Sequence, residues 1–117
     1  MAYILIVDSQ AEFRQQLLRC LEEAGHRATA VGTTIEAAKL VQDYVPDLLA
    51  TEAVRVDGSS TNLTKQAEAT GAKILMMTGS ADRIVQFEGT GQPYLSRPFT
   101  SEAFLQRVRN ILGETHT

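Results

Sequence analysis

Short apolar runs alternate along the chain with segments in which apolar residues recur at helical spacing. The apolar runs predict five strands, at Tyr3–Val7, Ala28–Val31, Leu48–Thr51, Lys73–Met77 and Tyr94–Ser96. The first run is apolar throughout, which is typical of a parallel strand covered on both faces. Strands that alternate with helices in this way indicate right-handed crossovers. They predict an α/β fold in which helices cover both faces of a doubly wound, five-stranded parallel sheet.

Each strand is followed by a segment of helical spacing, so five helices are expected. The first helix ends before Gly25, and its apolar residues are Phe13, Leu17, Cys20, Leu21 and Ala24. The second begins after a cap at Thr33 or Thr34. We expect its inner face to consist of Ile35, Ala38, Val41 and Val45.

The last three helices differ in the strength of their pattern. A short third helix is centred on the segment 63–67. The fourth surrounds Ile84–Phe87 and is interrupted by Gly89 and Gly91. Because glycine weakens helices, we expect the fourth helix to be short or frayed. Thr100 can cap an amphipathic final helix, whose apolar residues are Phe104, Leu105, Val108, Ile111 and Leu112.

The composition indicates one small domain. A chain of 117 residues, 44% of them hydrophobic, is expected to form a single domain over residues 1–117, with a flexible tail at 113–117. The net charge is −3 and no basic block occurs, which argues against nucleic-acid binding by this domain. The run Tyr3–Val7 is too short for a signal peptide or a membrane span, so we expect a cytoplasmic protein without membrane contact. The single cysteine, Cys20, excludes an intramolecular disulfide and is expected in the core.

Polar residues follow four of the five predicted strands. They are Asp8 and Ser9 after the first strand, Glu52 after the third, Thr78 after the fourth and Arg97 after the fifth. In a doubly wound sheet the functional crevice lies beyond the carboxyl ends of the strands. We therefore expect these side chains to gather at one edge of the sheet.

At these residues the sequence resembles the receiver domains of two-component response regulators. The matching segments are Ile4–Asp8, Glu23–His26, Pro46–Leu48, Asp57–Gly58, Met77–Thr78 and Tyr94–Phe99, in that order along nearly the whole chain. The resemblance implies a CheY-like, flavodoxin-like fold with strand order 2-1-3-4-5. In the family, two adjacent acids after the first strand and an aspartate ending the third strand hold Mg²⁺, and that aspartate accepts a phosphoryl group.

The chain departs from the family's pattern at the phosphorylation site. Asp8 keeps the first acidic position, but Ser9 stands beside it where a second acid is expected. Glu52 occupies the phosphoacceptor position and Arg97 replaces the lysine that contacts the phosphate. Thr78 keeps the hydroxyl of the family's switch. A degenerate metal site of Asp8, Ser9 and Glu52 predicts weak or absent Mg²⁺ binding and no other cofactor.

Glutamate and arginine also suggest what replaces the lost chemistry. One extra methylene moves the Glu52 carboxylate by roughly 1.5 Å, which disfavours phosphoryl transfer at this position. Arginine pairs with carboxylates through a planar fork of donors, so we expect Glu52 and Arg97 to form an ion pair. The resemblance further implies that Thr78 and Tyr94 are the switch residues. Glu52 either imitates the phosphorylated state in part or leaves a static binding platform.

The favoured interpretation is an atypical receiver domain that is not an enzyme and acts by binding a protein. The partner is a histidine kinase, an output domain or another receiver, with a homodimer through the fourth helix, fifth strand and fifth helix as one form. The expected interaction surface contains Phe87, Tyr94, Arg107 and Arg109.

Two alternatives remain open at this point. One is a receiver that is still phosphorylated slowly or at another residue. The other is a flavodoxin-like small-ligand binder or enzyme, which is disfavoured because no glycine-rich phosphate loop follows the first strand.

Overall fold

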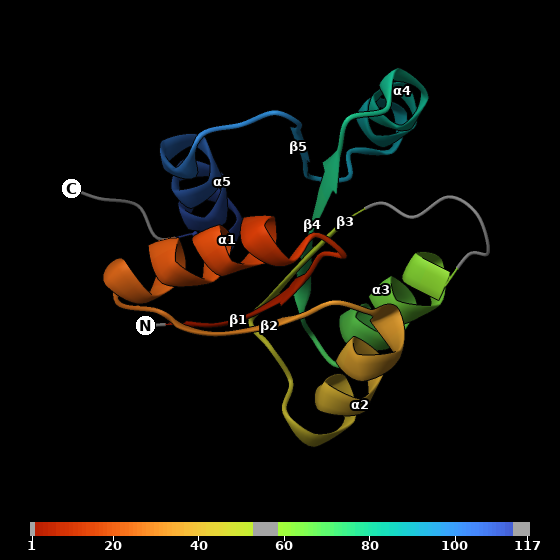
Figure 1. Ribbon diagram of the computed structural model, residues 1–117. Coiled ribbons are helices and arrows are strands. Elements are labelled where there is room, and N and C mark those ends of the chain that lie inside the picture. The colour runs from red at the N-terminus through yellow and green to blue at the C-terminus, as the bar shows by residue number, and fades with distance from the viewer. Residues whose placement is uncertain (1, 53–58, 114–117) are drawn as a thin grey trace.

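The computed structural model describes residues 2–52 and 59–113 of the chain (Figure 1). The loop that contains Asp57 and Gly58 and the last four residues of the expected tail lie outside the described residues. Among the residues that are described, no helix is both long enough and apolar enough to cross a membrane.

Five parallel strands form the sheet, in the order β2-β1-β3-β4-β5. This confirms the predicted fold class and strand order. The observed strands are close to the predicted ones, and each of the three that differ is longer by one residue. Their bounds are β1 Tyr3–Val7, β2 Arg27–Val31, β3 Leu48–Glu52, β4 Lys73–Thr78 and β5 Tyr94–Ser96.

Five helices follow the strands in turn, as the sequence predicts. Two of them, α1 and α5, cover one face of the sheet, while α2 and α3 cover the other (Figure 1). The remaining helix, α4, lies beside β5 at the end of the sheet. Their bounds are α1 Ala11–Glu23, α2 Thr34–Asp43, α3 Ser59–Ala69, α4 Ala81–Thr90 and α5 Ser101–Leu112.

The hydrophobic core has two halves, one on each face of the sheet. Ile4 and Ile6 of β1 pack with α1 and α5, whereas Leu5 and Val7 pack with α2 and α3. All four side chains are at most 1% exposed. This explains why β1 is apolar at every position, because successive residues of a strand point to opposite faces and both faces are covered here.

Side-chain caps set the start of three helices. Thr33 caps α2 by accepting a hydrogen bond from the Glu36 amide at 3.1 Å, so the predicted cap is Thr33 rather than Thr34. Thr100 caps α5 through the Ala103 amide at 3.0 Å, as predicted. Each cap satisfies one of the backbone N–H groups that a helix leaves without a partner at its N-terminus.

The fourth helix is longer than the sequence suggests. It runs for 10 residues, with Gly89 inside it, and it ends at Gly91 in the left-handed conformation with φ of 75°. Ser80 caps its first turn, and Phe87 anchors it against the body of the domain at 5% exposure. The stabilisation from the Ser80 cap and from burial of Phe87 exceeds the helix stability of about 1 kcal/mol that is lost with a glycine inside a helix.

The inner face of α2 also differs from the prediction. Ala37 and Val41 are buried, whereas Ile35 is 71% exposed. Residues two positions apart in a helix point in directions about 200° apart, so Ile35 and Ala37 lie on nearly opposite sides of α2. Val45, which is 50% exposed, lies beyond the helix end at Asp43, where helical spacing no longer applies.

Candidate functional site

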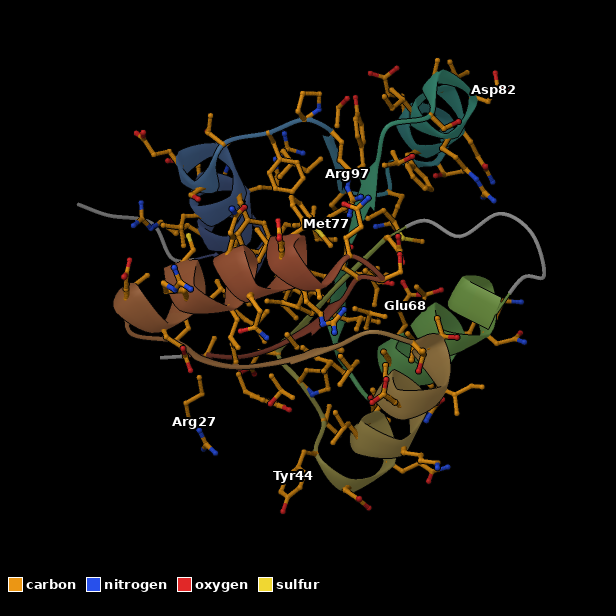
Figure 2. The ribbon with its side chains drawn as sticks, in the orientation of Figure 1. Arg27, Tyr44, Glu68, Met77, Asp82 and Arg97 are labelled. Carbon is orange, nitrogen blue, oxygen red and sulfur yellow. The ribbon has the colours of Figure 1, made fainter. Side chains whose placement is uncertain are left out.

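The polar residues at the carboxyl ends of the strands meet at one edge of the sheet, as predicted. Strand register brings them together, because Val7 of β1 pairs with Thr51 of β3, and Glu52 of β3 pairs with Met77 of β4. Arg97 follows β5, and its amide donates a hydrogen bond to the Thr78 carbonyl at 2.8 Å. Figure 2 shows the Arg97 side chain at this edge of the sheet, above Met77.

Asp8 is the most deeply buried group of the site. Its side chain has no exposed surface, and both carboxylate oxygens accept protein donors. Oδ1 accepts from the Gln10 amide at 2.9 Å, and Oδ2 pairs with the guanidinium of Arg97. A buried carboxylate needs such partners, because removing a charge from water is costly unless it is paired and hydrogen-bonded.

Among the described residues, Glu52 bonds to the loop that follows β1 and not to a cation. Its Oε1 accepts from the Ser9 amide at 2.8 Å, and its Oε2 accepts from the Ser9 hydroxyl at 3.4 Å. The carboxylate therefore tethers the end of β3 to the first residues after β1. The longer side chain of glutamate provides the reach for this contact.

The sequence predicts an ion pair between Glu52 and Arg97, and this prediction is wrong. Arg97 pairs with Asp8, which is 0% exposed, while Glu52 is only half-buried. The fully buried carboxylate gains most from the guanidinium, because an ion pair is screened least where water is excluded. Glu52 finds neutral donors on Ser9 instead.

An aromatic ring also packs against the Arg97 guanidinium. Its central carbon lies 4.4 Å from the centroid of the Phe13 ring, a cation–π contact. The Arg97 side chain is 23% exposed, and its Nε has no hydrogen-bond partner among the described residues. Burial lowers the pKa of this guanidinium, yet arginine keeps its charge in proteins. Sequence reasoning identified Phe13 only as a core residue of the first helix.

Arg14 is a further residue of the site that the sequence analysis missed. Its Nη1 donates to the backbone carbonyls of Asp8 at 3.1 Å and Ser9 at 3.4 Å. The guanidinium lies against Gly32, where a Cβ atom would be 3.2 Å from Nη1. Nothing in the sequence pattern distinguishes Arg14 from a solvated arginine in the first turns of a helix, so only the structure reveals the contact.

Thr78 is buried, and its hydroxyl is used locally. Its Oγ1 accepts from the Ser80 amide at 3.0 Å, and the Ser80 side chain accepts in turn from the Arg83 amide at 3.4 Å. The two hydroxyls thus connect the end of β4 to the start of α4. Thr78 is 5% exposed.

Tyr94 points toward α4, where its hydroxyl donates to Oε2 of Glu88 at 2.8 Å. The neighbouring carboxylate raises the pKa of the phenol, because ionising the tyrosine would remove the donated proton and place two negative charges together. The ring lies 6.2 Å from the ring of Phe87, which is buried at 5% exposure. Phe87 is therefore not part of the exposed surface on which the sequence analysis placed it. The large apolar side chain that α4 exposes is Val85, at 69%.

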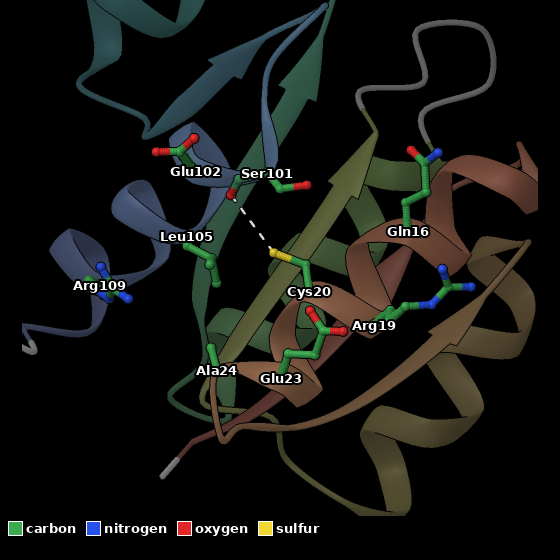
Figure 3. A pocket seen from close by; sticks show the side chains of 9 residues that line it. All are labelled: Gln16, Arg19, Cys20, Glu23, Ala24, Ser101, Glu102, Leu105 and Arg109. Carbon is green, nitrogen blue, oxygen red and sulfur yellow. Dashed lines mark hydrogen bonds between the residues drawn. The ribbon is translucent and has the colours of Figure 1, made fainter.

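Arg107 and Arg109 of α5 have separate environments. Arg107 donates to the backbone carbonyl of Tyr94 and so holds β5. Arg109 lines a groove of about 630 Å³ between α1 and α5, which Figure 3 shows from close by. Cys20 lines the same groove, where its Sγ lies 3.8 Å from the Ser101 carbonyl and burial raises the pKa of the thiol. None of the residues at the strand ends lines this groove.

Comparisons with proteins of known sequence support one family, although no protein-family model matches the chain. The chain is similar to the response regulator MprA of Mycobacterium ulcerans, with 29% identity over 119 aligned residues. The MprA protein of Mycobacterium leprae is also 29% identical. Each alignment covers 96% of this chain but only about half of the relative, so the chain spans about half the length of the curated relatives that it matches.

Solved structures agree with this assignment. A two-component response regulator from Clostridium difficile superposes with a TM-score of 0.82 and 26% identity, covering 100% of both chains. The chemotaxis response regulator CheY4 of Vibrio cholerae has a TM-score of 0.81 at 23% identity, covering 95% of this chain and 98% of its own. Strand order, the polar residues at the strand ends and these similarities together support a CheY-like receiver fold, similar to that of the response regulators of two-component signalling.

Proposed function

We propose that this chain is an atypical receiver domain that acts by binding a protein partner and does not depend on phosphorylation of an aspartate. One observation carries the proposal. At the position where the family has its phosphoacceptor stands Glu52, and both of its carboxylate oxygens accept hydrogen bonds from Ser9. The group that should attack a phosphoryl donor is instead a structural tether between β3 and the loop after β1.

The chemistry of phosphoryl transfer supports this reading. The protein's contribution to such transfer is mostly positioning and stabilisation of the charge that develops on the phosphoryl oxygens. Arg97, which stands where the family has its phosphate-contacting lysine, is already paired with Asp8. A phosphoryl group on Glu52 would have to displace the bonds from Ser9 and draw Arg97 away from a fully buried carboxylate.

The switch residues are likewise held by partners within the domain. The hydroxyl of Thr78 accepts from the Ser80 amide, and that of Tyr94 donates to Glu88. A ligand shifts a conformational equilibrium only by its different affinity for the two states. These contacts favour a static binding platform over a partial mimic of the phosphorylated state.

The surface formed by α4, β5 and α5 is the proposed contact face, which we call the α4–β5–α5 face. Val85 is exposed on its α4 side, and the half-buried Tyr94 lies on β5. The candidate partners are a second copy of the chain, a histidine kinase or an output domain in the cytoplasm. The relatives are response regulators by name, which supports a partner within two-component signalling.

The test is the intact mass of the purified protein after incubation with Mg²⁺ and a small-molecule phosphodonor. We expect no phosphoryl adduct on the parent protein. A Glu52→Asp variant is treated in the same way. If the glutamate alone prevents phosphorylation, only this variant gains an adduct. An acid-labile adduct on the parent protein would overturn the proposal and favour phosphorylation at Glu52 or another residue.

A further inference from the structure

We infer that Arg97 is a built-in cation that takes the place of the divalent metal ion, so that the site at the strand ends is closed to Mg²⁺. This inference deepens the proposed function, because it names what holds the site in one state. It also gives Arg97 a role different from that of the lysine it replaces. The inference rests on the donors, charges and burial at four residues.

The first argument is that the carboxylate oxygens are already used. Asp8 accepts from the Gln10 amide and from Arg97, and Glu52 accepts from the amide and hydroxyl of Ser9. Each of the four carboxylate oxygens thus has a protein donor. Mg²⁺ needs oxygen ligands at about 2.0–2.1 Å in near-octahedral geometry, and it could gain them only by displacing these donors.

The second argument is that the charges are already balanced. The two carboxylates of Asp8 and Glu52 are accompanied by the guanidinium of Arg97 and, on the backbone carbonyls of the same loop, by that of Arg14. A metal ion at Asp8 would meet Arg97 at the distance of an ion pair. Like charges so close repel strongly where water is largely excluded.

The third argument is that Arg97 is held in place. Its guanidinium lies over the Phe13 ring at 4.4 Å, and its side chain is only 23% exposed. Moving it away would remove the only countercharge that the described residues give the carboxylate of Asp8, which is 0% exposed. Among the described residues there is also no group of three or more histidine, cysteine, aspartate or glutamate side chains that could hold a metal ion.

The residues present therefore do not fit a resident Mg²⁺. Arg97 instead joins the end of β5 to the buried end of β1 without a bound ligand. It is a positioning residue, which acts through Asp8 and the loop that follows it.

The test measures the melting temperature of four proteins in titrations with MgCl₂ and MnCl₂. They are the parent, Arg97→Met, Arg97→Lys and the double variant Asp8→Asn with Arg97→Met. The parent and the double variant should respond alike and only to ionic strength. Arg97→Met should melt lower and should regain at least about 4 °C in a saturable manner on adding either divalent cation, because its two carboxylates are then unbalanced.

Arg97→Lys keeps the positive charge but loses the planar fork, so it should show a smaller saturable gain than Arg97→Met. It decides the question if Arg97→Met does not fold. A saturable gain in the parent protein would overturn the inference, as would folded Met and Lys variants that both ignore divalent cations. This result is independent of the phosphodonor experiment, since a phosphoryl adduct would overturn the proposed function while a metal response in the melting curves would overturn only the role of Arg97.

Discussion

The guanidinium of Arg97 pairs with the fully buried carboxylate of Asp8, although the two residues are 89 positions apart in the chain. The pair joins the loop after β5 to the loop after β1 across the edge of the sheet. Glu52, which stands between them in the strand order, bonds to Ser9 instead. This division of partners determines how the variants of the site should behave.

Arg97→Met should destabilise the domain far more than Glu52→Gln. Removing one partner of a buried ion pair leaves a buried charge without compensation, which costs about 3 kcal/mol or more. Glutamine at position 52 still offers an oxygen to the Ser9 amide, so the cost should be about 1 kcal/mol or less. Urea denaturation of the three proteins measures both differences. If Glu52→Gln were the more damaging change, Glu52 rather than Asp8 would be the partner of Arg97.

Two glycines, one inside α4 and one directly after its last residue, should respond to alanine in opposite directions. Gly89 lies inside the helix with nothing within 4 Å of an added Cβ, so Gly89→Ala should stabilise the domain by about 0.5–1 kcal/mol. Gly91 ends the helix at φ of 75°, where alanine is strained, so Gly91→Ala should destabilise by about 1 kcal/mol. Thermal unfolding of both variants tests the observed extent of α4. A helix that frayed before Gly89 would leave Gly89→Ala without effect.

The phenol of Tyr94 should titrate at higher pH than an ordinary tyrosine, because it donates to the carboxylate of Glu88. Its raised pKa means that the folded state favours the protonated phenol. The stabilisation is fully present below the pKa of about 10 of an unfolded tyrosine, and it is lost as the pH rises through the higher folded value. Ultraviolet titration of the phenolate, with Tyr94→Phe to assign the signal, measures this pKa. Glu88→Gln should lower it, and no change in that variant would contradict the contact.

Val85→Asp should weaken self-association through the α4–β5–α5 face. A charge at the centre of an apolar contact typically raises the dissociation constant about tenfold or more. Ile35→Asp is the matched control, because Ile35 is 71% exposed and Val85 69%, but Ile35 lies on α2 at the other side of the sheet. Sedimentation velocity over a range of protein concentrations compares the two variants with the parent. Equal weakening by both variants would point away from the proposed face, and a parent that stays monomeric throughout would exclude the homodimer.

The sequence alone determined the architecture and the location of the site. Apolar runs such as Tyr3–Val7 and helical spacing such as that of Leu17, Cys20 and Leu21 are local patterns, and burial against a sheet imposes them directly. Parallel strands bring their carboxyl ends to one edge, so the positions of Asp8, Glu52, Thr78 and Arg97 in the chain were enough to predict that they gather there.

Only the tertiary structure decided which of these residues contact one another. Whether Arg97 reaches Asp8 or Glu52 depends on the depth of each carboxylate and on the direction of the side chain that leaves β5. Phe13 and Arg14 join the site because the first turn of α1 lies against it, and Phe87 is buried beside the ring of Tyr94. Such contacts join segments far apart in the chain, and their energies come from desolvation and three-dimensional geometry, which no local periodicity encodes.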